Sequence, residues 1–240
     1  MKGLPSHQVT KSPEIILALD VNNLARAKYF VNKLYPKIKI FKVGLELFTA
    51  CGPKIIDFIQ KKGAGVFLDL KFHDIPNTMA AAAKKALQYK VAMLTVHTLA
   101  GPEALKAVVR VCSGSKTKVL GVTILTSICA HFLKDLQIKR SLGEEVLYLA
   151  KMARRCGLDG VVCSPDETKA IRGALGKNFL IVTPGIRPQF TAAGDQKRIA
   201  TPALATKAGS NFLVIGRPVL EAKDPLFILQ KIVDSIRQIK

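Results

Sequence analysis

Residues 15–23 read IILALDVNN, and they decide between the two fold classes open to this chain. The apolar run at residues 15–19 is typical of a parallel strand that is buried on both faces. In a doubly wound nucleotide-binding sheet, the first strand is followed by a glycine-rich turn. Here Asp20 ends the strand and Val21, Asn22 and Asn23 follow it, with no glycine. The stretch therefore favours an α/β barrel over a doubly wound sheet.

The same pattern recurs along the chain, because short apolar runs alternate with longer stretches that have helical periodicity. Eight β-α units in 240 residues are the number and size expected of a TIM (β/α)8 barrel. The predicted strands are 15–20, 38–43, 65–70, 91–97, 118–123, 160–163, 179–182 and 211–215. The predicted helices are 24–34, 51–62, 77–89, 102–112, 143–156, 166–175, 201–209 and 225–239.

No linker or change of composition divides the chain, so we expect one domain over residues 1–240. Residues 1–13 (MKGLPSHQVTKSP) precede the first strand and are expected to form a flexible or capping segment. They contain no apolar segment of the kind found in signal peptides, and no apolar run approaches the roughly 18 residues of a membrane span. We therefore expect a cytoplasmic protein with no membrane contact.

The net charge is +20, yet both halves of the chain are basic and no run of like charges stands out. A nucleic-acid-binding protein is the rival from another class, and it would have clustered basic residues interleaved with aromatic ones. Aromatic residues make up only 6% and tryptophan is absent, so we expect no nucleic-acid partner. Diffuse positive charge suits the attraction of small anions.

Five cysteines occur, an odd number with no C-x-x-C pair. This pattern predicts reduced thiols that behave as small buried apolar residues. No histidine has a companion at the spacing of metal ligands, so no metal site is expected.

Residues capable of chemistry stand at nearly every predicted strand end, where the active sites of barrels lie. In chain order, the strand ends provide Asp20, Lys42, Asp69 with Lys71, His97, Thr126, Ser164, residues 183–185 (TPG), and Gly216 with Arg217.

The densest of these segments is FLDLKFHDIPNT at residues 67–78. Side chains alternate between the two faces of a strand, so Asp69 and Lys71 are predicted to point the same way. Lys42 ends the neighbouring strand, and the three side chains then alternate in sign around one small volume. A salt-bridge ladder that caps the barrel is the structural alternative. Gathering several charges in one place is costly unless each is paired, which favours a functional array.

Asp74 cannot be placed by strand alternation, because Pro76 favours an extended backbone at Ile75 and puts Asp74 on a turn. Three positions stay open for its carboxylate: its own site, the site of another subunit, or the cap of the helix that begins near Asn77.

The loops after the last two strands predict a phosphate site. Residues 183–187 read TPGIR and residues 216–218 read GRP, with a proline suited to the first turn of a short helix. This is the usual phosphate position in such barrels, and Arg217 would add a charge-assisted fork. The polar segment 187–198 (RPQFTAAGDQKR) is predicted to form a lid over the phosphate.

These motifs resemble those of the orotidine 5'-phosphate decarboxylase family, in its shorter bacterial branch. The segment DLKFHDIPNT at residues 69–78 matches the family signature. Residues 42–44 (KVG), 125–127 (LTS), 184–187 (PGIR) and 195–196 (DQ) fit in order and spacing. The resemblance implies cofactor-free conversion of orotidine 5'-phosphate to UMP and CO2, the last step of de novo pyrimidine nucleotide synthesis.

The resemblance also implies roles for individual residues. Lys71 would donate a proton to C6 of the pyrimidine, within a charged array of Lys42, Asp69, Lys71 and Asp74 of the partner subunit. Ribose and base contacts would come from Asp20, Lys42, Asp69, Thr126 and, across a homodimer interface, Ile75 and Thr78. The phosphate would be held by Arg187, Gln196, Gly216 and Arg217. The nearest rival within the enzyme class is a Mg²⁺-dependent sugar-phosphate decarboxylase or aldolase of the same suprafamily.

Overall fold

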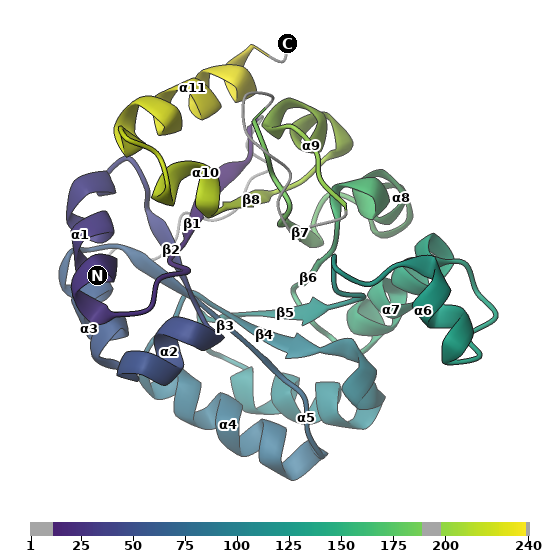
Figure 1. The fold of residues 1–240 in the computed structure, drawn as a ribbon. Coiled ribbons are helices and arrows are strands. Elements are labelled where there is room, and N and C mark those ends of the chain that lie inside the picture. Colours follow the sequence, from purple (N-terminus) through teal and green to yellow (C-terminus); the bar gives the residue numbers. More distant parts are fainter. Residues whose placement is uncertain (1–11, 189–197, 239–240) are drawn as a thin grey trace.

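The computed structural model describes residues 12–188 and 198–238, and it contains a closed barrel of eight parallel strands (Figure 1). Neighbouring strands follow chain order, and β8 closes the barrel by pairing with β1. The predicted TIM barrel is therefore confirmed. The strands are β1 (Glu14–Ala18), β2 (Ile40–Gly44), β3 (Gly65–Phe72), β4 (Met93–His97), β5 (Lys118–Val122), β6 (Gly160–Val162), β7 (Leu180–Thr183) and β8 (Phe212–Ile215).

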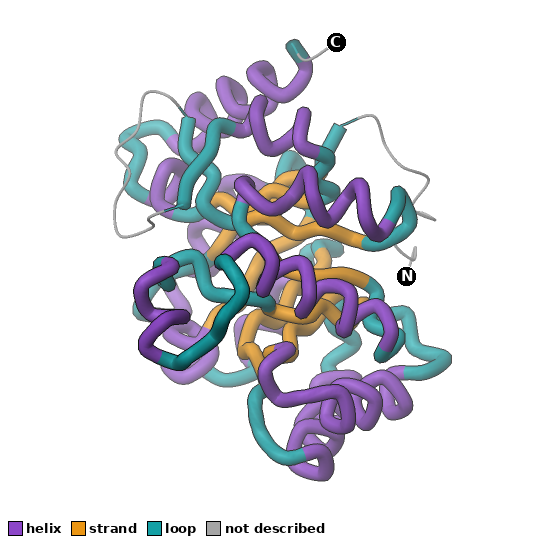
Figure 2. Tube along the Cα trace, turned by 90° about the vertical axis from the view of Figure 1, so that its right-hand side faces the viewer, coloured by secondary structure: helices purple, strands orange, loops and turns teal. Residues whose placement is uncertain are grey.

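Helices surround the strands on the outside of the barrel (Figures 1 and 2). Their apolar faces and the outward residues of the strands form the larger of two buried clusters. Among the described residues the helices are α1 (Leu24–Leu34), α2 (Leu45–Cys51), α3 (Lys54–Lys61), α4 (Pro76–Gln88), η1 (Thr98–Ala100), α5 (Gly101–Cys112), α6 (Ala130–Asp135), α7 (Leu142–Arg155), α8 (Pro165–Leu175), α9 (Pro202–Ala208), α10 (Arg217–Leu220) and α11 (Pro225–Arg237). None of these helices is long and apolar enough to cross a membrane.

The inside of the barrel changes character from one end to the other. Its amino-terminal part holds the smaller buried cluster, which includes Ile16, Ile40, Phe67 and Phe212. Side chains two residues apart on a strand point to the same face. Lys42 on β2 and Asp69 on β3 lie two residues after Ile40 and Phe67, so they also face the inside of the barrel. An apolar plug thus fills the barrel beneath a charged carboxyl-terminal end.

The predicted start of the second helix is wrong. The helix expected over 51–62 is preceded by the separate helix α2, and α3 begins only at Lys54. The break falls at Gly52, which has a φ of 58°, and at Pro53. Glycine tolerates this conformation and proline starts a helix readily, which explains the interruption.

The short helix α6 was not predicted, and it carries the exception to the expected burial of the cysteines. Cys112, Cys156 and Cys163 are buried and Cys51 is half-buried, whereas Cys129, at the N-cap of α6, is exposed.

Of the predicted N-terminal segment 1–13, residues 1–11 lie outside the described part of the chain.

Candidate active site

A cavity of about 230 Å³ opens at the carboxyl-terminal end of the barrel. Its apolar lining includes Ala18, Phe67, Val122, Val162 and Val214, from five different strands. The polar residues on its walls are Asp20, Lys42, Asp69, Lys71, Thr126, Arg187 and Arg217, together with the backbone of Gly216. The structure therefore brings together eight of the predicted site residues around one volume.

Four of these residues form a chain of alternating charge. The Nζ atom of Lys42 lies 2.9 Å from Oδ1 of Asp20 and 3.6 Å from Oδ2 of Asp69. The same Oδ2 atom accepts a hydrogen bond of 3.0 Å from Nζ of Lys71. Each interior member of the chain therefore has a partner of opposite sign on both sides, as a buried charge requires.

Burial and pairing act in opposite directions on the two innermost groups. Burial alone would raise the pKa of Asp69, but the ammonium groups of Lys42 and Lys71 outweigh it and the pKa lies below its ordinary value. Burial alone would lower the pKa of Lys42, but the carboxylates of Asp69 and Asp20 outweigh it and this pKa lies above its ordinary value. Both groups are therefore charged at neutral pH.

The backbone at Lys71 departs from the regular strand that the alternation argument assumed. Its φ is 51°, and the register between β3 and β4 shifts between Leu68 and Phe72. Asp69 and Lys71 still both line the cavity. The direction of the Lys71 side chain, however, is set by a bulge and not only by the alternation of side chains along the strand. Bulges commonly re-aim side chains next to active sites.

Thr95 on β4 holds this bulge, and sequence reasoning missed it. Its Oγ1 atom accepts a hydrogen bond of 2.9 Å from the backbone N–H of Lys71 and donates one of 3.0 Å to Oδ1 of Asp69. The available signal was a polar residue in the apolar run 93–97, two positions after the inward-facing Met93.

Gly44 gives Lys42 its space at the end of β2. A Cβ atom at this position would lie 2.9 Å from Nζ of Lys42. Glycine is favoured at this position of the KVG motif because the ammonium group of Lys42 approaches the backbone closely.

The predicted phosphate residues lie together in the cavity lining. Arg187 follows β7 and is buried, and Arg217 begins α10 directly after Gly216, the N-cap of that helix. Pro218 stands in its first turn, as predicted. Gln196 and most of the predicted lid over 187–198 lie outside the described residues.

Asp74, Ile75 and Thr78 do not line the cavity of their own chain. All three are exposed, and Ile75 is 67% accessible. The N-cap of α4 is Ile75 and no side chain caps the helix, although Asp74 accepts a hydrogen bond of 2.7 Å from the N–H of Ile75. Of the three positions left open for Asp74, the helix cap is not observed.

Residues 13–232 match the orotidine 5'-phosphate decarboxylase / HUMPS family, and the match spans every strand of the barrel. The chain belongs to this family. The charged cavity described above is therefore the candidate active site of a family member. Among the described residues no group of three or more histidine, cysteine, aspartate or glutamate side chains is arranged to hold a metal ion.

Individual members of the family are similar over nearly their whole length. An orotidine 5'-phosphate decarboxylase from Geobacter metallireducens is 48% identical over 228 residues, covering 93% of this chain and 95% of that protein. A crystal structure of the enzyme from Lactobacillus acidophilus has a TM-score of 0.82 at 38% identity and covers 94% of this chain and 99% of that one. The structure from Methanocaldococcus jannaschii, solved with the inhibitor BMP, has a TM-score of 0.78 at 26% identity and covers 95% and 100%.

Proposed function

We propose that this chain decarboxylates orotidine 5'-phosphate to UMP and CO2, the last step of de novo pyrimidine nucleotide synthesis, without a cofactor. The observation that carries the proposal is the Asp20–Lys42–Asp69–Lys71 chain of charges on one wall of a cavity that Arg187 and Arg217 also line. Such a cavity offers a proton donor and a phosphate site within one small volume. The names of the relatives support the same reaction.

The chemistry explains why a lysine held between carboxylates is needed. Loss of CO2 from C6 of the pyrimidine leaves an electron pair in the plane of the ring, where the π system cannot delocalise it. An ammonium group placed where this charge develops stabilises the transition state electrostatically. Lys71 then transfers a proton to C6. Asp69 holds the ammonium in place through the 3.0 Å contact and, as a second effect, crowds the departing carboxylate.

The remaining cavity residues bind the rest of the nucleotide in this proposal. Asp20 and Lys42 contact the ribose hydroxyls, and Thr126 contacts the pyrimidine. Arg187, Arg217 and the backbone of Gly216 hold the phosphate, with Gln196 as a further predicted ligand. Binding energy from the phosphate is then used to order the site around the reacting carbon.

Asp74, Ile75 and Thr78 complete the site of a partner subunit in a symmetric homodimer. Their exposure and their absence from the cavity of their own chain support this assignment. The cytoplasmic location and the absence of nucleic-acid partners stay predictions.

The rival within the family is a Mg²⁺-dependent reaction on a sugar phosphate. The two cavity carboxylates, Asp20 and Asp69, already bind lysine ammonium groups, which compete with a cation for the same oxygen atoms. Activity on orotidine 5'-phosphate that survives EDTA would favour the decarboxylase, and activity that needs added Mg²⁺ would favour the rival.

Loss of the orotate absorbance after mixing with orotidine 5'-phosphate tests the reaction, and Lys71→Ala tests its mechanism. We expect Lys71→Ala to abolish turnover while the fold survives, because the proton donor is lost. Lys118→Ala is the matched control, since Lys118 pairs with Asp159 at 2.8 Å and begins β5, away from the cavity. No absorbance change with the wild type would contradict the proposed reaction. Turnover of Lys71→Ala within about tenfold of wild type would remove Lys71 as the donor.

A further inference from the structure

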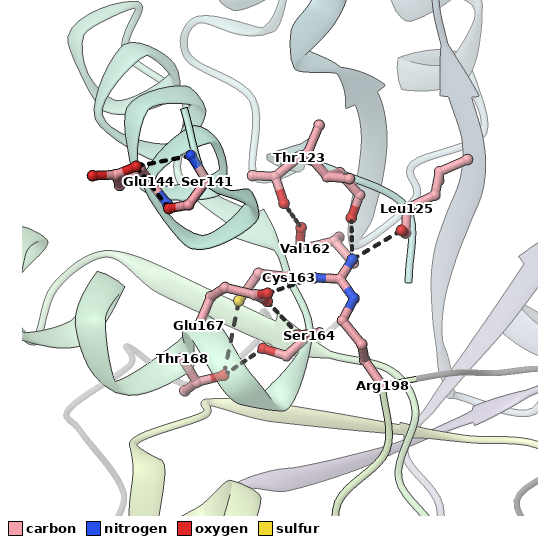
Figure 3. Close-up of polar contacts among 11 residues, drawn as sticks. Thr123, Leu125, Ser141, Glu144, Val162, Cys163, Ser164, Glu167, Thr168 and Arg198 are labelled. Carbon is pink, nitrogen blue, oxygen red and sulfur yellow. Dashed lines mark hydrogen bonds and ion pairs between the residues drawn. The ribbon is translucent and has the colours of Figure 1, made fainter. Parts of the chain in front are cut away.

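Arg198 is a buried cation beside the cavity that the proposed chemistry does not use. Its side chain is only 10% exposed, and its Nη1 atom forms an ion pair with Oε1 of Glu167, which is equally buried. Glu167 also accepts a hydrogen bond from Oγ of Ser164, the N-cap residue of α8 (Figure 3). Arg198 itself does not line the cavity.

The guanidinium group of Arg198 also reaches the loop after β5. Its Nη2 atom donates to the carbonyl oxygen of Ile124 at 3.2 Å. It also donates to the carbonyl oxygen of Leu125 at 2.9 Å (Figure 3). Both residues line the cavity and directly precede Thr126, the proposed pyrimidine contact. Arg198 therefore fixes the backbone from which Thr126 projects.

The backbone beside Arg198 is joined to the segment proposed to bind phosphate. The N–H of Ala200 donates to the carbonyl of Gly185 at 3.1 Å, and the N–H of Arg187 donates to the carbonyl of Ala200 at 2.9 Å. Gly185 has a φ of 77°, and a Cβ atom there would lie 2.6 Å from the carbonyl oxygen of Arg198. This glycine thus permits the close approach of the two segments.

We propose that Arg198 is a positioning residue, which couples the phosphate-binding segment after β7 to the pyrimidine-binding loop after β5. Phosphate binding orders residues 185–187, these residues hold Arg198 through Ala200, and Arg198 holds the carbonyls that precede Thr126. This inference rests on the proposed function, because it takes Arg187 as a phosphate ligand and Thr126 as a pyrimidine contact.

An arginine suits this position for a physical reason. A guanidinium group has five donors in a fixed planar arrangement, so one side chain serves the Glu167 carboxylate and two carbonyl groups at once. A lysine ammonium is a compact group on a flexible stem. Arg198→Lys should therefore keep the ion pair with Glu167 and lose at least one carbonyl contact.

The test compares catalytic efficiency on orotidine 5'-phosphate with that on orotidine, which lacks the phosphate. For Arg198→Ala and Arg198→Lys we expect kcat/KM on the nucleotide to fall at least about tenfold, and kcat/KM on the nucleoside to change less than about threefold. Orotidine brings no phosphate to order residues 185–187. With that substrate Arg198 therefore has no effect of phosphate binding to pass on to the loop after β5. Arg198→Lys keeps the test valid if Arg198→Ala does not fold.

Arg172→Ala is the matched structural control. Arg172 also bridges carbonyl groups, those of Gly176, Phe179 and Gly209, but it does so before β7 and β8 begin, away from the cavity. We expect this variant to lose stability and to affect both substrates alike. The double variant Arg198→Ala/Arg217→Ala should lose less on the nucleotide than the product of the two single losses, because coupled residues are not additive.

Three outcomes would overturn the proposal. Equal losses on both substrates would give Arg198 a structural role only, and a loss under about threefold on the nucleotide would give it no role in the reaction. Multiplicative losses in the double variant would make Arg198 independent of the phosphate site. If Arg217→Ala also fails to discriminate between the substrates, the phosphate assignment itself is wrong, so the failure lies in the proposed function.

Discussion

His97 ends β4 as a neutral ring close to the charged array. Burial, reinforced by the electrostatic effect of His73 and Lys71, lowers its pKa to about 4. Its ring stacks on that of His73 with 5.0 Å between centroids, and its Nδ1 atom accepts a hydrogen bond from the N–H of Leu99. The ring therefore serves as a hydrogen-bond acceptor in the turn that follows β4.

The depressed pKa of His97 predicts a loss of stability in mild acid. Between pH 6.5 and about pH 4 the unfolded chain binds a proton at this position and the native protein does not. The contribution of the neutral His97 ring to the free energy of unfolding is complete above pH 6.5, and it is lost as the pH falls toward 4. We expect the urea midpoint of the wild type to fall more steeply over this range than that of His97→Gln, whose side chain does not titrate. Parallel curves for the two proteins would contradict the assignment.

At the scale of single residues, sequence reasoning succeeded where topology fixes position. Lys42 and Asp69 end neighbouring parallel strands, so their proximity follows from the fold alone. The roles of Thr95 and Arg198 were not predicted, for a common reason. Each residue acts through hydrogen bonds to a segment that is distant in the chain. Neither lies in a sequence motif that points to its partner.

At the scale of elements, the register shift between β3 and β4 is the feature that aims Lys71, the proposed proton donor. Beyond Leu68 the ladder resumes only at Phe72, paired with Val96, and Lys71 lies in the bulge with a positive φ. A positive φ is unfavourable for a residue with a Cβ atom, so neighbouring contacts must hold it. The hydroxyl of Thr95 supplies two of them.

Thr95→Val tests this arrangement, because it removes the hydroxyl and changes the shape of the side chain little. The N–H of Lys71 loses its acceptor, so we expect a loss of about 1–3 kcal/mol in unfolding free energy. Misplacement of Lys71 should reduce kcat by up to about a hundredfold. Urea denaturation and steady-state kinetics measure the two effects.

Thr117→Val is the control for that variant. Its hydroxyl donates to the carbonyl of Val91 at 2.7 Å from another buried site, outside the cavity. A similar loss of stability with unchanged kcat is expected. If Thr95→Val keeps full activity, the bulge does not depend on Thr95.

The elements that sequence reasoning missed are short helices in the connections. Helix α2 fills the connection that follows Gly44, and α6 lies between β5 and α7. Periodicity needs more than about two turns to stand out, and these helices have seven and six residues. The eight strands were found because each contains a run of mostly apolar, buried residues.

At the scale of the whole molecule, one edge of the barrel mouth carries a group of exposed apolar side chains. Leu45, Ile75 and Leu99 follow the consecutive strands β2, β3 and β4, and each is about half or more exposed. Parallel strands end on the same side of a barrel, so these residues lie at one end of the molecule. Asp74 belongs to the same edge, which is the proposed dimer interface.

If Asp74 completes the site of the partner, two inactive variants should restore each other. In a symmetric dimer each site would combine Lys71 of one subunit with Asp74 of the other. Random reassortment of Lys71→Ala with Asp74→Ala makes half of the dimers hybrid, and each hybrid has one site with both residues intact. We therefore expect activity to recover to about a quarter of the wild-type value, given independent sites.

Subunit exchange must be measured separately, for example by native mass spectrometry of one tagged and one untagged variant. Mixing Lys71→Ala with Asp69→Ala is the matched control, because both residues belong to the same wall of one cavity. Each hybrid of that pair lacks one residue in each site, so no activity should return. If hybrids form and the Lys71→Ala and Asp74→Ala pair also stays inactive, Asp74 does not serve the site of its partner. The proposed dimer interface would then rest on Ile75, Thr78 and the exposed apolar edge.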